Sequence, residues 1–171
     1  MDGDQARGAS IELVTTDPGT HPLVGSPIPA FSLPNQFGEA VSLEGIGAAR
    51  AFVVFYPFAF SRVCTGELAA LERMRPALEA SGVSLHGISV DHKHALRAYA
   101  TEQGIGFDLL ADFWPHGEVA RAFGCFDEDH GRALRSTFLL AGGRVVEHFS
   151  SGIGEPRSGQ DYLDAVARLS P

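Results

Sequence analysis

The sequence predicts an α/β sandwich in which helices flank a central mixed β-sheet. A continuous run of apolar, β-branched and aromatic residues at 51–56 is typical of a strand buried on both faces. The next segment has apolar residues at three- and four-residue spacing, which indicates an amphipathic helix over about 63–80. Near the C-terminus, two strand-like runs flank turn residues 141–143 and predict a β-hairpin. Together they predict a sheet with both parallel and antiparallel strands.

The other elements follow from patterning in chain order. Residues 31–33 and 40–43 flank a polar turn and predict a short N-terminal β-hairpin. Beyond the helix at 63–80, we expect a strand at 83–90, a helix over 92–103, a short extended segment at 107–110, a helix over 116–123, strands at 136–140 and 145–149, and a closing helix over 159–169. A βαβ unit followed by a ββα unit is the layout of a thioredoxin-like sandwich.

Length and composition indicate one domain. The chain has 171 residues, of which 44% are hydrophobic and 20% charged, as in ordinary globular domains. Residues 1–22 lack a sustained apolar period and are expected to form a mobile N-terminal tail, so the domain covers 23–171. The net charge of −8 argues against nucleic acid or an anionic membrane as the main partner.

The lack of a recognisable targeting signal and the small number of cysteines favour a cytoplasmic location. No apolar run approaches the roughly 20 residues of a membrane span, and the polar, acidic start of the chain does not resemble a secretory signal. Two cysteines are too few for a disulfide scaffold, which indicates a reducing compartment. The scattered histidines form no metal-ligand pattern, so we expect neither a metal nor another cofactor.

Cys64 follows the first buried strand and lies in the first turn of the predicted helix. The first N–H groups of a helix have no internal partners, and the helix dipole places positive potential there. Both features favour a reactive thiolate. The alternative is an inert cysteine that packs as a small hydrophobic residue.

The residues around Cys64 resemble the peroxiredoxin active-site motif Pro-x-x-x-Thr/Ser-x-x-Cys, with matches at Pro57, Ser61 and Cys64. The resemblance implies that Pro57 shields the sulfur from water and that Ser61 directs its hydroxyl at the same pocket. Serine at 61 replaces the threonine of most family members, which keeps the hydroxyl but loses the methyl group that restricts its rotamers. A hydroxyl and a helix N–H can both donate to the oxygens of a peroxide.

A later stretch, 131–138, resembles the family segment that carries an arginine near the thiolate, and Arg135 matches that arginine. The resemblance implies that Arg135 stabilises both the thiolate and the developing oxyanion. Taken alone, the residue would be read as an ordinary surface arginine. Residues 110–117 and 122–124 are similar to the one-cysteine, alkyl hydroperoxide reductase E type of peroxiredoxin, whose members are typically homodimers. Trp114 could serve such an interface or the core, and we favour the core.

The second cysteine, Cys125, has two interpretations. It could be a resolving thiol that forms a disulfide with Cys64, or a buried small hydrophobic residue at a strand start. The predicted fold does not bring the two cysteines within disulfide reach, and we favour burial.

These features lead to three hypotheses for function. The first is a thiol-dependent peroxidase that reduces hydrogen peroxide and organic hydroperoxides through a Cys64 sulfenic acid. Its reductant would be an external thiol or a thioredoxin- or glutaredoxin-like protein. The second, a disulfide reductase, lacks the partner cysteine of a Cys-x-x-Cys motif. The third is a redox-sensing or binding domain that keeps the fold without turnover.

Overall fold

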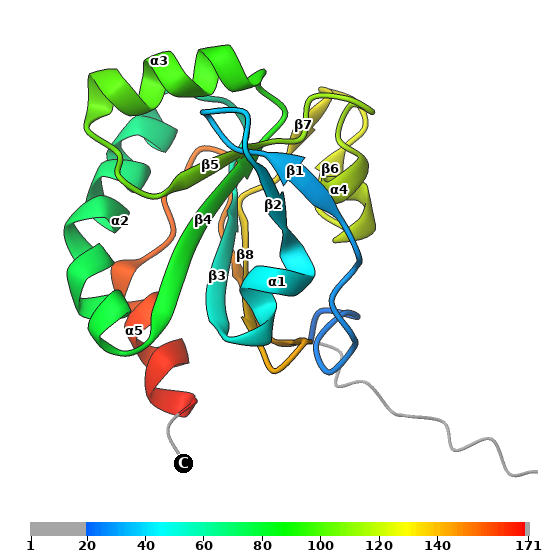
Figure 1. The fold of residues 1–171 in the computed structure, drawn as a ribbon, viewed down its shortest axis with the longest axis vertical. Helices are drawn as coiled ribbons and strands as arrows, with labels where there is room; N and C mark the ends of the chain where they lie inside the picture. Colours follow the sequence, from blue (N-terminus) through cyan, green and yellow to red (C-terminus); the bar gives the residue numbers. More distant parts are fainter. Residues whose placement is uncertain (1–19, 170–171) are drawn as a thin grey trace, which may run out of the picture.

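A computed structural model describes residues 20–169 as helices packed on both faces of a five-stranded sheet (Figure 1). The elements in chain order are β1 (Ser32–Pro34), β2 (Ala40–Ser42), α1 (Leu43–Ala48), β3 (Arg50–Phe55), α2 (Arg62–Ala80), β4 (Val83–Ser89), α3 (Lys93–Gln103), β5 (Asp108–Ala111), α4 (Glu118–Ala122), β6 (Phe126–Asp127), β7 (Arg132–Ala133), β8 (Ser136–Ala141), β9 (Arg144–Ser150) and α5 (Gly159–Arg168).

The central sheet is mixed, as the sequence predicts. Its strand order is β5-β4-β3-β8-β9. Strands β3, β4 and β5 are parallel, whereas β8 is antiparallel to both β3 and β9. The predicted thioredoxin-like sandwich and its N-terminal hairpin, formed by β1 and β2, are therefore confirmed. Because β3 is the central strand, the loop that follows its carboxyl end lies near the middle of the sheet rather than at its side.

Alternate residues of β3 face opposite layers, which explains why the strand is apolar from Ala51 onward. Phe52 and Val54 pack in a cluster with α2, α3 and α5. Val53 and Phe55 pack in a second cluster with α1 and α4. Figure 1 shows this arrangement, with α2 and α5 on one side of the sheet and α1 and α4 on the other. A strand with period-two alternation between two cores is hydrophobic at every position.

The predicted N-terminal tail falls mostly outside the described residues. Of its residues 1–22, the structure describes 20–22. The ring of His21 lies 4.9 Å from that of Phe138 and 4.4 Å from that of His148, measured between centroids. The next turn, around Gly25, is hydrogen-bonded to Val145 of β9. The chain is thus fastened to the sheet from His21 onward.

Candidate active site

Cys64 lies in the first turn of α2, directly after the loop that leaves β3. Ser61 is the N-cap residue of α2, and its Oγ accepts a hydrogen bond from the Cys64 backbone N–H at 3.4 Å. A serine at this position satisfies one of the free N–H groups of the helix and fixes where the helix begins. The spacing of Ser61 and Cys64 in the motif thus has a structural basis. The Cys64 side chain is fully buried.

Arg135 reaches the cysteine from the short connection between β7 and β8, 71 residues further along the chain. Its Nη2 atom lies 3.2 Å from Sγ of Cys64, close enough to donate a hydrogen bond to the sulfur. Its Nε donates to the carbonyl of Ile153 at 2.7 Å, which holds the guanidinium in place. The side chain is 2% exposed, so the alternative of an ordinary surface arginine is wrong. A guanidinium in this position places a permanent positive charge directly beside the sulfur.

Two further charged residues complete a buried cluster that the sequence did not reveal. Glu67, one turn beyond Cys64 on α2, forms an ion pair with Arg157 and lies 3.6 Å from Nη1 of Arg135. The Arg157 backbone N–H donates to Glu67 at 2.6 Å, and its Nη1 donates to the carbonyl of Phe55 at 2.7 Å. All three charged side chains are buried. The cluster therefore ties α2 to the strands beneath it.

The three charged side chains of this cluster carry one net positive charge next to the sulfur. Arg135 and Arg157 carry two positive charges, and Glu67 carries one negative charge. A buried group of charges is costly unless it is paired. A thiolate on Cys64, in contact with Arg135, supplies the missing negative charge. The arrangement thus favours a nucleophilic form of the sulfur.

A small pocket with a volume of about 190 Å³ opens where the loop after β3 meets the start of α2. Its wall includes Pro57, Ser61 and Arg135, three of the four residues that the sequence singles out, whereas Cys64 itself is buried behind the wall and does not line the pocket. Pro57 is buried and lies in the loop just after β3, where it forms part of the pocket wall. Peroxides are small, and a pocket of this size next to a thiolate can admit one. Among the described residues, no group of three or more metal-ligating side chains lies together.

Cys125 lies in the other core of the protein. Cys64 packs in the cluster with α2, α3 and α5, whereas Cys125 packs in the cluster with α1 and α4, across the sheet. Both thiols are free. Cys125 is 1% exposed, and burial raises the pKa of its thiol far above the ordinary value. The expected burial of Cys125 is confirmed.

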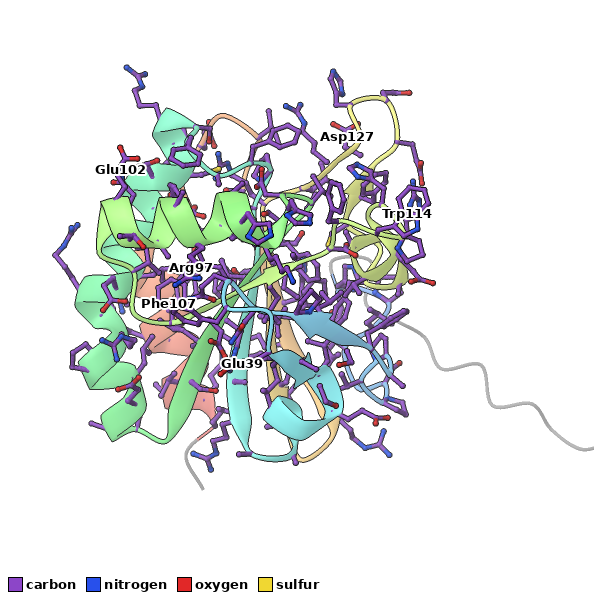
Figure 2. The ribbon with its side chains drawn as sticks, turned by 45° about the horizontal axis from the view of Figure 1, so that its top comes forward. Glu39, Arg97, Glu102, Phe107, Trp114 and Asp127 are labelled. Carbon is purple, nitrogen blue, oxygen red and sulfur yellow. The ribbon has the colours of Figure 1, made fainter. Side chains whose placement is uncertain are left out.

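The prediction that Trp114 belongs to the core is wrong. Its side chain is 82% exposed. Figure 2 shows it at the edge of the molecule beside α4. Trp114 lies in the loop after β5, where the chain has already left the sheet.

Comparisons with known proteins agree with this geometry. Residues 24–149 match the model of the AhpC/TSA family. The chain is 37% identical over 149 residues to alkyl hydroperoxide reductase E of Mycobacterium tuberculosis, an alignment that covers 86% of this chain and 97% of the relative. The chain belongs to the AhpC/TSA family of peroxiredoxins. It is a thiol peroxidase that reduces peroxides.

Other relatives of this peroxiredoxin extend the comparison. It is 33% identical over 130 residues to the peroxiredoxin Bcp of Escherichia coli, covering 72% of this chain and 82% of the relative. Among solved structures, Enterococcus faecalis AhpC superposes with a TM-score of 0.79 at 26% identity, over 85% of this chain and 91% of that one. Membership of this family favours the hypothesis of a catalytic peroxidase over that of a redox-sensing or binding domain. No helix within residues 20–169 combines the length and apolarity that crossing a bilayer requires.

Proposed function

We propose that this peroxiredoxin uses Cys64 as its attacking thiolate on hydrogen peroxide and organic hydroperoxides. The observation that carries the assignment is the 3.2 Å contact between Nη2 of Arg135 and the buried Sγ of Cys64. The sulfur attacks the terminal peroxide oxygen, so an S–O bond forms as the O–O bond breaks. The thiolate is oxidised to a sulfenic acid, and the peroxide leaves as an alkoxide or hydroxide that takes a proton to become alcohol or water.

The other pocket residues have supporting roles in this reaction. Arg135 contacts the sulfur and lines the pocket, so it can also stabilise negative charge on the departing oxygen. The hydroxyl of Ser61 caps α2 and faces the same pocket, where it can donate to a peroxide oxygen. Pro57 limits access of water to the sulfur. Arg135 and Ser61 act through donors that are in place before the peroxide arrives.

The test is peroxide consumption by catalytic amounts of the protein in the presence of an excess of external dithiol. We expect many turnovers per protein molecule with both hydrogen peroxide and an organic hydroperoxide. The same assay with Ser61→Ala should proceed more slowly than with Ser61→Thr, which keeps the hydroxyl. Consumption limited to one equivalent of peroxide under these conditions would contradict a catalytic role.

We further propose a one-cysteine mechanism in which an external thiol reduces the sulfenic acid. The placement of Cys64 and Cys125 in cores on opposite faces of the sheet supports it. An external thiol condenses with the sulfenic acid to a mixed disulfide and water, and a second thiol then releases Cys64. The reductant is a small thiol or a thioredoxin- or glutaredoxin-like protein. Both cysteines being free fits a reducing compartment, which we propose to be the cytoplasm and which cell fractionation tests.

Replacement of Cys125 tests the one-cysteine mechanism. We expect Cys125→Ala to keep peroxidase activity within about twofold when an external thiol is supplied, since the residue serves packing. Loss of the buried sulfur should cost about 1–2 kcal/mol of stability, measured by chemical denaturation. Rapid formation of a Cys64–Cys125 disulfide in the wild type on peroxide addition, with no sulfenic acid trapped by dimedone, would contradict the mechanism.

We also propose that the protein is a homodimer through exposed aromatic residues near the active site. Phe58 and Phe60 follow β3, Phe113 and Trp114 follow β5, and all four are more than a third exposed. Because β3 and β5 are parallel strands of one sheet, these residues extend from the same sheet edge. Exposed aromatic residues that gather in this way are typical of protein interfaces.

A charge introduced at Trp114 tests the dimer. We expect the wild type to sediment as a dimer at micromolar concentration and Trp114→Glu to shift to a monomer. Leu163→Glu is the matched control, because Leu163 is an exposed apolar residue on α5, away from this sheet edge. A monomeric wild type, or a Trp114→Glu variant that remains dimeric, would refute the proposed interface.

A further inference from the structure

The loop between β3 and α2 holds a backbone conformation that requires outside support. Phe60, which directly precedes the helix cap Ser61, has a φ of +65°. Within residues 20–169 it is the one non-glycine residue with a positive φ. This left-handed region is unfavourable for a residue with a Cβ atom and persists only where the surroundings enforce it. Phe60 is half exposed, so burial of its own side chain is a weak constraint.

Asp91 supplies one support from the end of the neighbouring strand. Its Oδ2 accepts a hydrogen bond from the backbone N–H of Ala59 at 2.8 Å. The same oxygen accepts from the hydroxyl of Ser89 at 2.7 Å, and Ser89 is fully buried. Asp91 follows β4, which pairs in parallel with β3, so the two strand ends lie side by side. A short, charge-assisted hydrogen bond therefore fastens the residue before Phe60 to a rigid strand end.

Tyr99 of α3 supplies the second support. Its ring meets that of Phe60 edge to face at a centroid distance of 5.1 Å. Its hydroxyl donates to Oγ1 of Thr65 at 3.3 Å, one residue beyond Cys64. The Tyr99 side chain is buried in the core. Tyr99 therefore contacts one residue before the cysteine and one after it. The backbone N–H of Ala59 is held by Asp91 instead.

We propose that Asp91 is a positioning residue for the peroxide reaction. By holding Ala59, it keeps the loop folded so that Pro57 and Ser61 cover the sulfur of Cys64 in the geometry that a peroxide needs. Asp91 touches neither the sulfur nor the pocket wall and acts through the loop. This proposal rests on the assignment of Cys64 as the nucleophile.

Two electrophiles distinguish positioning from a general loss of stability. Hydrogen peroxide needs the ordered pocket, whereas iodoacetamide needs only access to the buried thiol. In Asp91→Ala we expect the second-order rate constant with hydrogen peroxide to fall at least about tenfold and that with iodoacetamide to stay the same or rise. Asp91→Asn keeps an oxygen that can accept from Ala59, so its ratio of the two rate constants should remain within about threefold of the wild type.

Two further variants complete the experiment. Asp129→Ala removes an exposed carboxylate elsewhere and should leave the ratio unchanged. Ser89→Ala removes the hydrogen bond that the Ser89 hydroxyl donates to Oδ2 of Asp91 and the one that it accepts from the Asp91 backbone N–H. It should lower the ratio by about threefold, which covers the case that Asp91→Ala does not fold. An unchanged ratio in folded Asp91→Ala, or in Ser89→Ala if the former does not fold, would overturn the proposal. Equal losses in Asp91→Asn and Asp91→Ala would do the same. Failure of the underlying assignment would be recognised separately, because Cys64→Ser would then retain turnover.

Discussion

Cys64→Ser is expected to abolish peroxide turnover while leaving the fold intact. Serine has nearly the shape of cysteine and can accept the hydrogen bond from Arg135, so the buried site should tolerate it. Its hydroxyl remains protonated near neutral pH, and within residues 20–169 the one side chain that hydrogen-bonds to Sγ of Cys64 is Arg135, which is not a base. We expect turnover to fall at least about a thousandfold, a change in activation free energy of about 4 kcal/mol.

The measurement is the rate of peroxide consumption with an external thiol in excess, together with a circular dichroism spectrum to establish folding. Cys125→Ala is the matched control, because it removes the other thiol in the chain. If Cys64→Ser kept near-normal turnover, the proposed assignment of the nucleophile would be lost. If both cysteine variants lost activity, a second thiol would have to enter the catalytic cycle.

Arg135→Met is expected to have the next largest effect. Methionine keeps much of the aliphatic volume but removes the positive charge next to the sulfur. Glu67 and Arg157 would still neutralise one another, so a thiolate on Cys64 would be left without a compensating charge. We expect the rate of peroxide attack to fall at least about tenfold, which corresponds to more than 1 kcal/mol.

Thiolate absorbance in the ultraviolet, followed against pH, gives the second readout for this variant. The thiolate fraction near neutral pH should be lower in Arg135→Met than in the wild type. Arg168→Met is a suitable control, since Arg168 pairs with Glu147 on the surface of α5 and β9. An Arg135→Met variant with unchanged absorbance and an unchanged rate would show that the arginine contributes packing alone.

The sequence predicts the central strands and long helices because their patterns are strong and local. It does not predict α1, which has six residues and contains Gly45 and Gly47, a composition typical of loops. Tertiary packing explains the glycine at position 47, since a Cβ atom there would lie 2.2 Å from the side chain of Ile28. Strands β6 and β7 have two residues each, too few to show any periodicity.

The site is predictable where a motif is contiguous and is missed where it depends on tertiary contacts. Cys64, Ser61 and Pro57 lie within eight positions of one another, and their spacing is visible in the sequence. Glu67 gives a fainter signal, because it is a carboxylate on the buried face of α2 beside Leu71. Arg157 lies in an irregular loop before α5, where the sequence gives no indication of burial.

The exposure of Trp114 could not be read from composition. Aromatic residues are favoured both in cores and at interfaces, so residue type does not distinguish the two. What decides the outcome is that the chain has already left β5 at this point and runs along the outside of the sheet edge.

The mass of the intact protein after one equivalent of hydrogen peroxide distinguishes a sulfenic acid from a disulfide. We expect a gain of one oxygen atom, located on Cys64 by peptide mapping and retained in Cys125→Ala. We also expect the added oxygen to disappear on incubation with an external thiol. Loss of two hydrogen atoms, with a Cys64–Cys125 disulfide in the peptide map, or no change in mass at Cys64, would contradict the one-cysteine peroxidase mechanism.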